Sequence, residues 1–295
     1  RVLFRSDVPI VMVTVSADTT VKHAAFDAGV TDFLVKPYDH YECRARCRNL
    51  LIMREQTLLL KDRAKLLESE IGKAVKQMRT RERETIMFAA NLSEYHANQH
   101  GYRILRITRY ARLIAEGMGL PPDMVERIEI ASTLHDIGKI GVADDLLLDG
   151  LELTEAQDHE LREHTEIGHR LLSGNSSEYL QMAAEIALHH HERYDGKGYP
   201  KGIKGRDIPL AARIVAVADA FEMLTSGPHQ KGNKDMTLIL NSLMARKGYE
   251  FDPVCVEALG SQIDTATEVI ETFARSEEHT SELQSLAYLV CRLLL

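Results

Sequence analysis

The sequence lacks long apolar runs, a positive charge balance and a cysteine framework, and each absence excludes a class of protein. No run of about eighteen apolar residues occurs and no signal peptide opens the chain, so we expect no membrane partner. The 36 Lys and Arg residues are outnumbered by 44 Asp and Glu residues, a net charge of −8, which argues against duplex nucleic acid as a partner. The four cysteines follow no disulfide spacing, which fits a cytoplasmic location.

Both ends of the chain look foreign to the rest. Residues 1–6 (RVLFRS) and 275–295 (RSEEHTSELQSLAYLVCRLLL) resemble sequencing adapters translated in frame. The alternative for the second segment is an amphipathic C-terminal helix. We expect both segments to be artefacts and exclude them from the fold prediction. The natural fragment would then span residues 7–274, with its real N-terminus missing.

Residues 7–38 alternate between strand and helix patterns. Pro9–Val15 is a short, β-branched apolar run typical of a buried strand, and Thr31–Val35 is a second one. Thr19–Gly29 between them predicts a helix that Gly29 closes. This order predicts a fragment of an α/β domain.

The same segment resembles the last two βα units of a response-regulator receiver domain. The resemblance places Thr14 and Lys36 where that family contacts its phosphorylated aspartate. The phosphoacceptor would lie upstream, so this truncated receiver cannot accept a phosphate itself. The partner implied is a sensor kinase that acts through the full receiver.

Residues 39–83 predict a long helical linker. Leucines recur at helical spacing among many charged residues, and no proline interrupts them after Pro37. Such a helix cannot bury itself, which indicates a signalling linker or a coiled coil. Its heptads are imperfect, so a homodimer through this helix and a monomeric linker both remain open.

Residues 84–274 predict a domain made only of helices. A stripe with helical spacing begins this region and consists of Ile104, Ile107, Ala111 and Ile114. Thr154 and Gln157 have the spacing of a capping box, at the start of a helix that we expect to carry His164. No alternating strand pattern follows, so the fold class is mainly α.

Histidines and aspartates gather where the predicted helices end. A single helical histidine is usually a surface or core residue, but this group is harder to dismiss: His135, Asp136, His164, His190, His191 and Asp219. Asp219 lies within an apolar stretch, IVAVADAFEML, where an unpaired buried carboxylate would be costly. Bound cations would remove that cost, and mixed imidazole and carboxylate ligands suit Fe, Mn or Zn.

Five motifs resemble those of the HD-GYP family in order and spacing. They are HDIGK (135–139), His164, HHERYDGKGYP (190–200), IPLAARIVAVADAF (208–221) and GYEFDP (248–253). The resemblance covers residues 84–274 and implies an all-helical, HD-type metal-dependent phosphohydrolase. It also implies hydrolysis of cyclic di-GMP to linear pGpG or GMP with two divalent metal ions, Fe(II) or Mn(II).

The resemblance implies two metal sites that share Asp136. His135 and Asp219 would complete one site, and the other would use three histidines: His164, His190 and His191. A hydroxide bridging the metals would attack phosphorus. His189 would lie outside the ligand set.

Substrate contacts are implied for Lys139 and for the loop formed by Gly198, Tyr199 and Pro200. Lys139 would hold a non-bridging phosphate oxygen; the alternative is an exposed lysine near a helix end. Tyr199 would either pack against the ligand or anchor its loop. The glycines of the loop permit unusual backbone angles and close approach.

The chain departs from the family pattern at four positions. A family Glu and His that bind metal are replaced by Gln99, a weak ligand, and Arg103, which cannot coordinate a metal. A substrate-binding Arg is replaced by Pro228, with Lys231 as the basic residue that remains, and a family Asp is replaced by Glu222.

Two interpretations follow from these departures. His96 and His100 could supply the missing ligands, or Arg103 could contact a substrate phosphate. Six retained ligands favour an active phosphodiesterase, whereas Arg103 and Pro228 favour a degenerate domain that binds cyclic di-GMP or a protein without turnover. A mononucleotide phosphohydrolase is disfavoured by the GYP loop.

Overall fold

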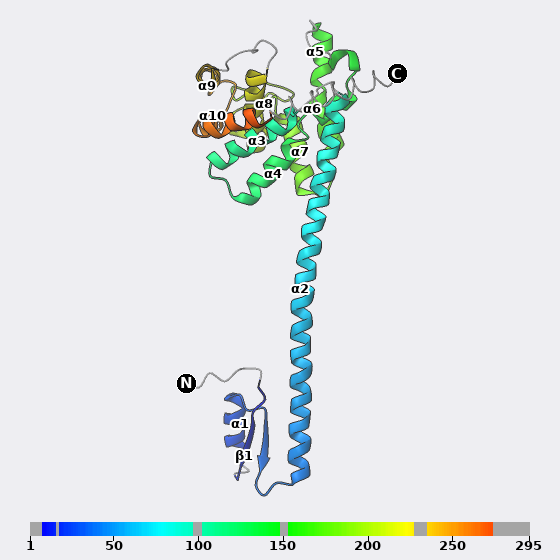
Figure 1. Ribbon diagram of the computed structural model, residues 1–295, viewed down its shortest axis with the longest axis vertical. Coiled ribbons are helices and arrows are strands. Elements are labelled where there is room, and N and C mark those ends of the chain that lie inside the picture. Colours follow the sequence, from blue (N-terminus) through cyan, green and yellow to red (C-terminus); the bar gives the residue numbers. More distant parts are fainter. Residues whose placement is uncertain (1–7, 16–17, 97–101, 148–152, 227–234, 274–295) are drawn as a thin grey trace, which may run out of the picture. The chain divides into compact units, whose positions relative to one another are not determined.

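The computed structural model describes five ranges of the chain, which are 8–15, 18–96, 102–147, 153–226 and 235–273 (Figure 1). The chain forms two compact units, Arg1–Thr80 and Arg81–Leu295. Several predicted features lie outside the described residues: both foreign-looking ends, Gln99, His100, Pro228 and Lys231.

The first unit contains the predicted strand, helix and strand. Strand β1 (Val11–Thr14) pairs in parallel with β2 (Asp32–Val35), and α1 (Thr19–Asp27) connects them. The carboxylate of Asp18 accepts a hydrogen bond from the backbone N–H of Thr20 at 2.9 Å and so caps α1. The order of elements is confirmed, while the assignment to a receiver domain stays a prediction.

Helix α2 (His40–His96) contains the predicted linker and continues beyond residue 83. Arg46 in its second turn donates to both carboxylate oxygens of Asp32 at 2.9 Å, which joins α2 to β2. Large apolar side chains along α2 are exposed, among them Leu60 at 65% and Leu67 at 57%. Past residue 80, Ile86 and Ala90 of the same helix are buried in the core of the second unit.

The second unit is helical throughout its described residues, apart from one isolated bridge between Lys247 and Phe251. Its α-helices are α3 (Arg103–Gly117), α4 (Pro122–Ser132), α5 (Glu155–Arg162), α6 (His164–Leu172), α7 (Glu178–His189), α8 (Leu210–Ser226), α9 (Met236–Ala245) and α10 (Pro253–Ser261). Three short 3-10 helices are η1 (Ile137–Gly141), η2 (Asp144–Leu147) and η3 (Gly205–Asp207). The predicted mainly α fold is confirmed.

Helices α3 and α7 organise the core of this unit. Helix α3 packs against α4, α8 and α10, and α7 packs against α4, α6 and α8. The predicted stripe on α3 is buried, with Ile104 at 4% exposed and Ile107 at 0%. Tyr110 of α3 meets Phe221 of α8 edge to face at 4.8 Å. The apolar stripe therefore fixes α3 against α8, the helix that carries Asp219.

The start of α5 agrees with the sequence, but its end does not. The capping box is confirmed, because Thr154 Oγ1 accepts from the N–H of Gln157 and the Gln157 side chain accepts from the N–H of Thr154. The prediction that this helix carries His164 was wrong, since α5 ends at Arg162 and His164 begins α6. The His164 ring contacts the carbonyl oxygen of Leu161 at 2.6 Å and so competes with the backbone at this junction.

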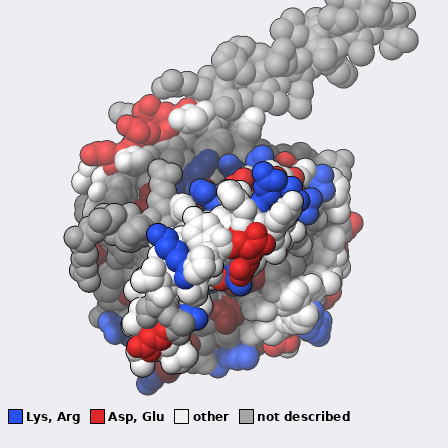
Figure 2. Space-filling view, turned by 90° about the horizontal axis from the view of Figure 1, so that it is seen from below, with Lys and Arg blue, Asp and Glu red and all other residues white. Residues whose placement is uncertain are grey.

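Two surface properties bear on possible partners. None of the described helices combines the length and apolar character that a membrane crossing requires. Figure 2 shows Lys and Arg side chains interspersed with Asp and Glu side chains, so neither charge alone covers this face.

Candidate metal centre

The His135-Asp136 doublet lies in the turn between α4 and η1, and a glycine brings this turn against α6. A Cβ atom at Gly138 would lie 1.8 Å from the carbonyl oxygen of His164 and 2.5 Å from the backbone nitrogen of Gly168. Only glycine permits this approach. The close contact therefore holds Asp136 beside His164.

Four predicted ligands form one compact cluster, in which Asp136 faces three histidines: His164, His190 and His191. One candidate ligand atom from each residue lies within 4.8 Å of the others. Asp136 Oδ1 is 3.5 Å from the Nε2 atoms of both His164 and His190. The cluster joins the turn after α4, the start of α6 and the end of α7, three places far apart in the sequence.

Backbone carbonyls fix the orientation of three imidazole rings. The Nδ1 atoms of His135, His164 and His190 lie 2.9, 2.6 and 3.0 Å from carbonyl oxygens of the preceding turn. A carbonyl oxygen only accepts hydrogen bonds, so Nδ1 carries a proton, and in the neutral form of each ring Nε2 presents its lone pair. Metal-binding histidines commonly have this arrangement.

The polar atoms at the centre of the cluster are buried and unsatisfied. The Nε2 atoms of His135, His164 and His190, together with Asp136 Oδ1, have no hydrogen-bond partner among the described residues. Buried polar groups normally have partners, because leaving them unpaired is costly. A divalent cation would satisfy all these lone pairs together, so the residues present fit a metal ion.

The charge states also suit a cation. Burial lowers the pKa of His164 to about 4 and that of His191 well below its usual value, so both rings are neutral near pH 7. Burial alone would raise the pKa of Asp136, but Lys139 and His135 beside it lower that pKa well below its usual range. Neutral imidazoles and an ionised carboxylate are the forms that bind metals.

In the second predicted ligand set, which is His135, Asp136 and Asp219, an arginine contacts the two carboxylates. Asp219 Oδ1 accepts a hydrogen bond from Arg103 Nη2 at 2.6 Å, and Arg103 Nη1 lies 3.7 Å from Asp136 Oδ2. His135 Nε2 is 3.4 Å from the same Asp136 oxygen. The guanidinium of Arg103 therefore lies between the two carboxylates that would share this ion.

Predicted substrate-contacting residues border the cluster. Lys139 Nζ donates to Asp136 Oδ2 at 2.6 Å. The Tyr199 ring stacks on the His191 ring, with 4.8 Å between the ring centroids. The guanidinium carbon of Arg162 lies 4.8 Å from the centroid of the same Tyr199 ring. A Cβ atom at Gly198 would lie 2.3 Å from the backbone nitrogen of Arg193. The GYP loop thus packs directly against a ligand of the cluster.

Pro200 is the last residue of this loop, and the residue after it contacts the chain next to His190 and His191. The N–H of Lys201, the next residue, donates to Glu192 Oε1 at 2.8 Å. Glu192 follows His191 and is 4% exposed, so this hydrogen bond joins the end of the loop to the end of the histidine pair.

In the first unit, the two receiver-like residues lie at the ends of adjacent strands. Thr14 ends β1 and Lys36 directly follows β2. The backbone N–H of Lys36 donates to the carbonyl oxygen of Thr14 at 2.8 Å. Their proximity is the one expected for neighbouring parallel strands.

Sequence reasoning missed two ion pairs that support the site. Arg106 of α3 binds both carboxylate oxygens of Glu222 on α8, with distances of 2.8 to 3.1 Å. Arg213 of α8 pairs with Asp252, which also accepts from the N–H of Val254 and caps α10. The GYEFDP motif and the unusual residue at position 222 were the available signals, but neither reveals its partner.

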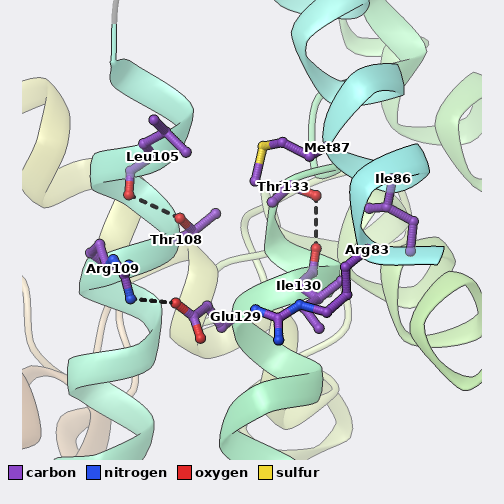
Figure 3. Close-up of a pocket in the computed structure, with 9 residues that line it drawn as sticks. All are labelled: Arg83, Ile86, Met87, Leu105, Thr108, Arg109, Glu129, Ile130 and Thr133. Carbon is purple, nitrogen blue, oxygen red and sulfur yellow. Dashed lines mark hydrogen bonds and ion pairs between the residues drawn. The ribbon is translucent and has the colours of Figure 1, made fainter. Parts of the chain in front are cut away.

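A shallow hollow of about 140 Å³ lies apart from the cluster, between the end of α2, α3 and α4 (Figure 3). Thr108, Arg109 and Glu129 are among its lining residues, and Arg109 donates to Glu129 at 2.8 Å. None of the six predicted ligands lines it. The predicted ligands therefore lie elsewhere, in and around the histidine cluster.

Comparison with known proteins identifies the class. Residues 65–254 match the family model described as HD domain, and the chain belongs to that family. It is 45% identical over 253 residues to the cyclic di-GMP phosphodiesterase response regulator RpfG of Xanthomonas campestris pv. campestris (strain 8004), with 86% of this chain and 67% of that protein covered.

Two further relatives belong to the same class of enzyme. A cyclic di-GMP phosphodiesterase of Thermotoga maritima is 33% identical over 277 residues, which cover 91% of this chain and 74% of the relative. The 3′3′-cGAMP-specific phosphodiesterase 2 of Vibrio cholerae is 34% identical over 182 residues, 62% of this chain and 35% of the relative. The predicted class, an HD-type phosphodiesterase, agrees with all three.

Proposed function

We propose that this chain is the output region of a response regulator that hydrolyses cyclic di-GMP to linear pGpG or GMP with divalent metal ions. The observation that carries the proposal is the convergence of unsatisfied imidazole Nε2 atoms on Asp136 Oδ1. The names of two relatives support cyclic di-GMP as the substrate. The strand–helix–strand segment of the first unit supports an input through a phosphorylated receiver and its sensor kinase.

One ion, Fe(II) or Mn(II), would be held by the compact cluster of Asp136, His164, His190 and His191. The sequence predicts a second ion at His135, Asp136 and Asp219. When bound, such ions neutralise phosphate charge and lower the pKa of water.

The chain's own residues would orient the substrate and the ligands. The carbonyl contacts to Nδ1 keep each imidazole in one tautomer and one orientation. Lys139, only 15% exposed in its side chain, would turn from Asp136 to a non-bridging oxygen of the scissile phosphate. Tyr199 would hold the His191 ring by stacking, and Arg162 would hold Tyr199 in turn.

The test is hydrolysis of cyclic di-GMP by the chain after anaerobic loading with Fe(II) or Mn(II), followed by chromatography. We expect turnover that falls by at least ~100-fold in Asp136→Ala, since this carboxylate contacts both ligand sets. Asp123→Ala removes a surface carboxylate on α4, 68% exposed in its side chain, and should leave turnover unchanged. Faster hydrolysis of 3′3′-cGAMP than of cyclic di-GMP would contradict the substrate assignment.

A second candidate is a domain that binds cyclic di-GMP without turnover. The ion pair between Arg103 and Asp219 favours it, because that carboxylate already has a cationic partner. Folded, metal-loaded protein that binds cyclic di-GMP in calorimetry but releases no linear product would establish this function instead.

A further inference from the structure

The arrangement of Arg103 bears on how many ions the centre holds. We propose that the Arg103 guanidinium replaces the second metal ion, so that the centre binds one divalent ion per chain and uses Arg103 as its second positive charge. The inference rests on the proposed function and deepens it. It also replaces the expectation of two ions drawn from the family resemblance.

The two oxygens of Asp136 face different surroundings. Oδ1 faces the Nε2 atoms of His164 and His190, each at 3.5 Å, and belongs to the compact cluster. Oδ2 faces Lys139 Nζ at 2.6 Å and Arg103 Nη1 at 3.7 Å. Among the described residues Oδ1 has no hydrogen-bond partner, so the ion held by the histidines would use this oxygen.

A second ion would have to bind on the side of Oδ2. Two positive charges already lie there in the free protein, because the Lys139 ammonium and the Arg103 guanidinium both approach that oxygen. Arginine remains protonated in proteins and offers no lone pair, so it cannot become a ligand. Like charges at this range repel strongly in a poorly hydrated site, and the two residues would disfavour another cation.

Asp219, the other carboxylate of the second set, is also engaged. Its Oδ1 lies 2.6 Å from Arg103 Nη2, and both side chains are mostly buried, at 14% and 22% exposed. A charge-assisted hydrogen bond of this length is strong. A metal ion would have to displace it.

The pairing repeats one helical turn further along α3 and α8. Arg106 and Glu222 form the next ion pair, and each lies three residues beyond Arg103 and Asp219. Both pairs join residues 116 positions apart, so the two helices keep one register across both contacts. Arginine–carboxylate pairing is thus the regular mode by which these helices meet, and Arg103 belongs to it.

Arg103 would still serve the reaction. A guanidinium presents planar donors that match two phosphate oxygens, and its charge does not depend on pH in the ordinary range. Beside a single ion, it would bind the non-bridging oxygens of the phosphodiester that the ion also contacts. Its role would be to orient the substrate and stabilise charge.

The test counts metal ions in the full chain, loaded anaerobically with excess Mn(II), desalted and analysed by mass spectrometry. We expect about one ion per chain in the wild type and in Arg103→Lys, and about two in Arg103→His and Arg103→Met, which remove the fixed charge. Electron paramagnetic resonance should show isolated Mn(II) ions in the wild type and in Arg103→Lys. It should show magnetically coupled Mn(II) ions in Arg103→His and Arg103→Met. Arg109→His, an exposed arginine on α3 paired with Glu129, should match the wild type.

The outcomes separate the two proposals. Two ions per wild-type chain would overturn the replacement by Arg103 and leave the proposed function standing. One ion in both neutralised variants, with melting temperatures near that of the wild type, would also overturn it. No bound ion in folded wild-type protein would overturn the proposed function as well.

Discussion

The carbonyl oxygen of His164 lies where a side chain at position 138 would begin. An added Cβ atom there would be 1.8 Å from that oxygen and 2.5 Å from the backbone nitrogen of Gly168. Both neighbours are backbone atoms, so neither can move aside cheaply. At the residue scale, the candidate metal centre thus depends on a residue without a side chain. Gly138 determines how closely Asp136 approaches the histidines.

We predict that Gly138→Ala destabilises the second unit by at least ~3 kcal/mol and abolishes metal binding, because η1 must move away from α6. Thermal unfolding and metal content would measure both effects. Gly72→Ala is the control, since a Cβ atom there meets nothing within 4 Å, and it should stabilise its helix by ~1 kcal/mol. Normal metal content in folded Gly138→Ala would contradict the role given to this glycine.

Residue types and short spacings were readable from the sequence at this scale, but distant pairings were not. His164 and the His190-His191 pair could be predicted because imidazoles and a carboxylate in that order suggest a metal site. The contact of Arg103 with Asp219 joins residues 116 positions apart, and no local pattern reveals it. That contact depends on the packing of α3 against α8.

At the scale of elements, α2 exposes a continuous apolar seam. Its members alternate at spacings of four and three residues, and they are Leu60, Ala64, Leu67, Ile71, Ala74 and Met78. Leu67 is 57% exposed and Ile71 62%. This spacing is that of the a and d positions in a coiled coil, with Leu60, Leu67 and Ala74 at d. We propose that a second copy of the chain covers this seam and forms a homodimer.

We predict that Leu67→Glu shifts the chain from dimer to monomer. A carboxylate in the seam would lose its hydration when the two helices associate, and this desolvation is costly. Sedimentation at micromolar concentrations would measure the mass. Leu59→Glu is the matched control, as Leu59 is 54% exposed but lies off the seam, and it should remain dimeric. A wild-type monomer at these concentrations would refute the dimer.

Element boundaries were predicted well where local chemistry sets them and poorly where packing does. The capping box of Thr154 and Gln157 gave the start of α5 correctly. The break between Arg162 and His164 was missed, since it depends on a histidine side chain that competes for a backbone carbonyl. Helix α2 shows no break at residue 83, because the change there is from exposed to buried and not from helix to loop.

At the scale of the molecule, apolar burial is unequally divided between the two units. The main core cluster begins at Ile86 and continues through Ile270. In the described part of the first unit, Leu34 is the buried hydrophobic residue, at 2% exposed, while Phe26 is 49% exposed. A two-stranded sheet with one short helix buries too little apolar surface to be stable alone.

We therefore predict that calorimetry of the chain shows one cooperative unfolding transition, which belongs to the second unit. A chain that begins at Arg81 should show this transition within a few degrees of its temperature in the longer chain. Mn(II) should raise that temperature in both chains to the same extent, because the ligands lie in the second unit. A separate transition lost with residues 1–80 would show that the first unit is independently stable.

The ion pair between Arg106 of α3 and Glu222 of α8 has an evolutionary consequence. Arg106 and Glu222 hold the two helices in register one turn away from the candidate metal centre. This pair would keep α3 and α8 in register if position 103 changed, and the arginine codons CGU and CGC differ from histidine codons by a single base. A single base change could therefore place an imidazole beside Asp219 and supply one of the two family ligands that this sequence replaces.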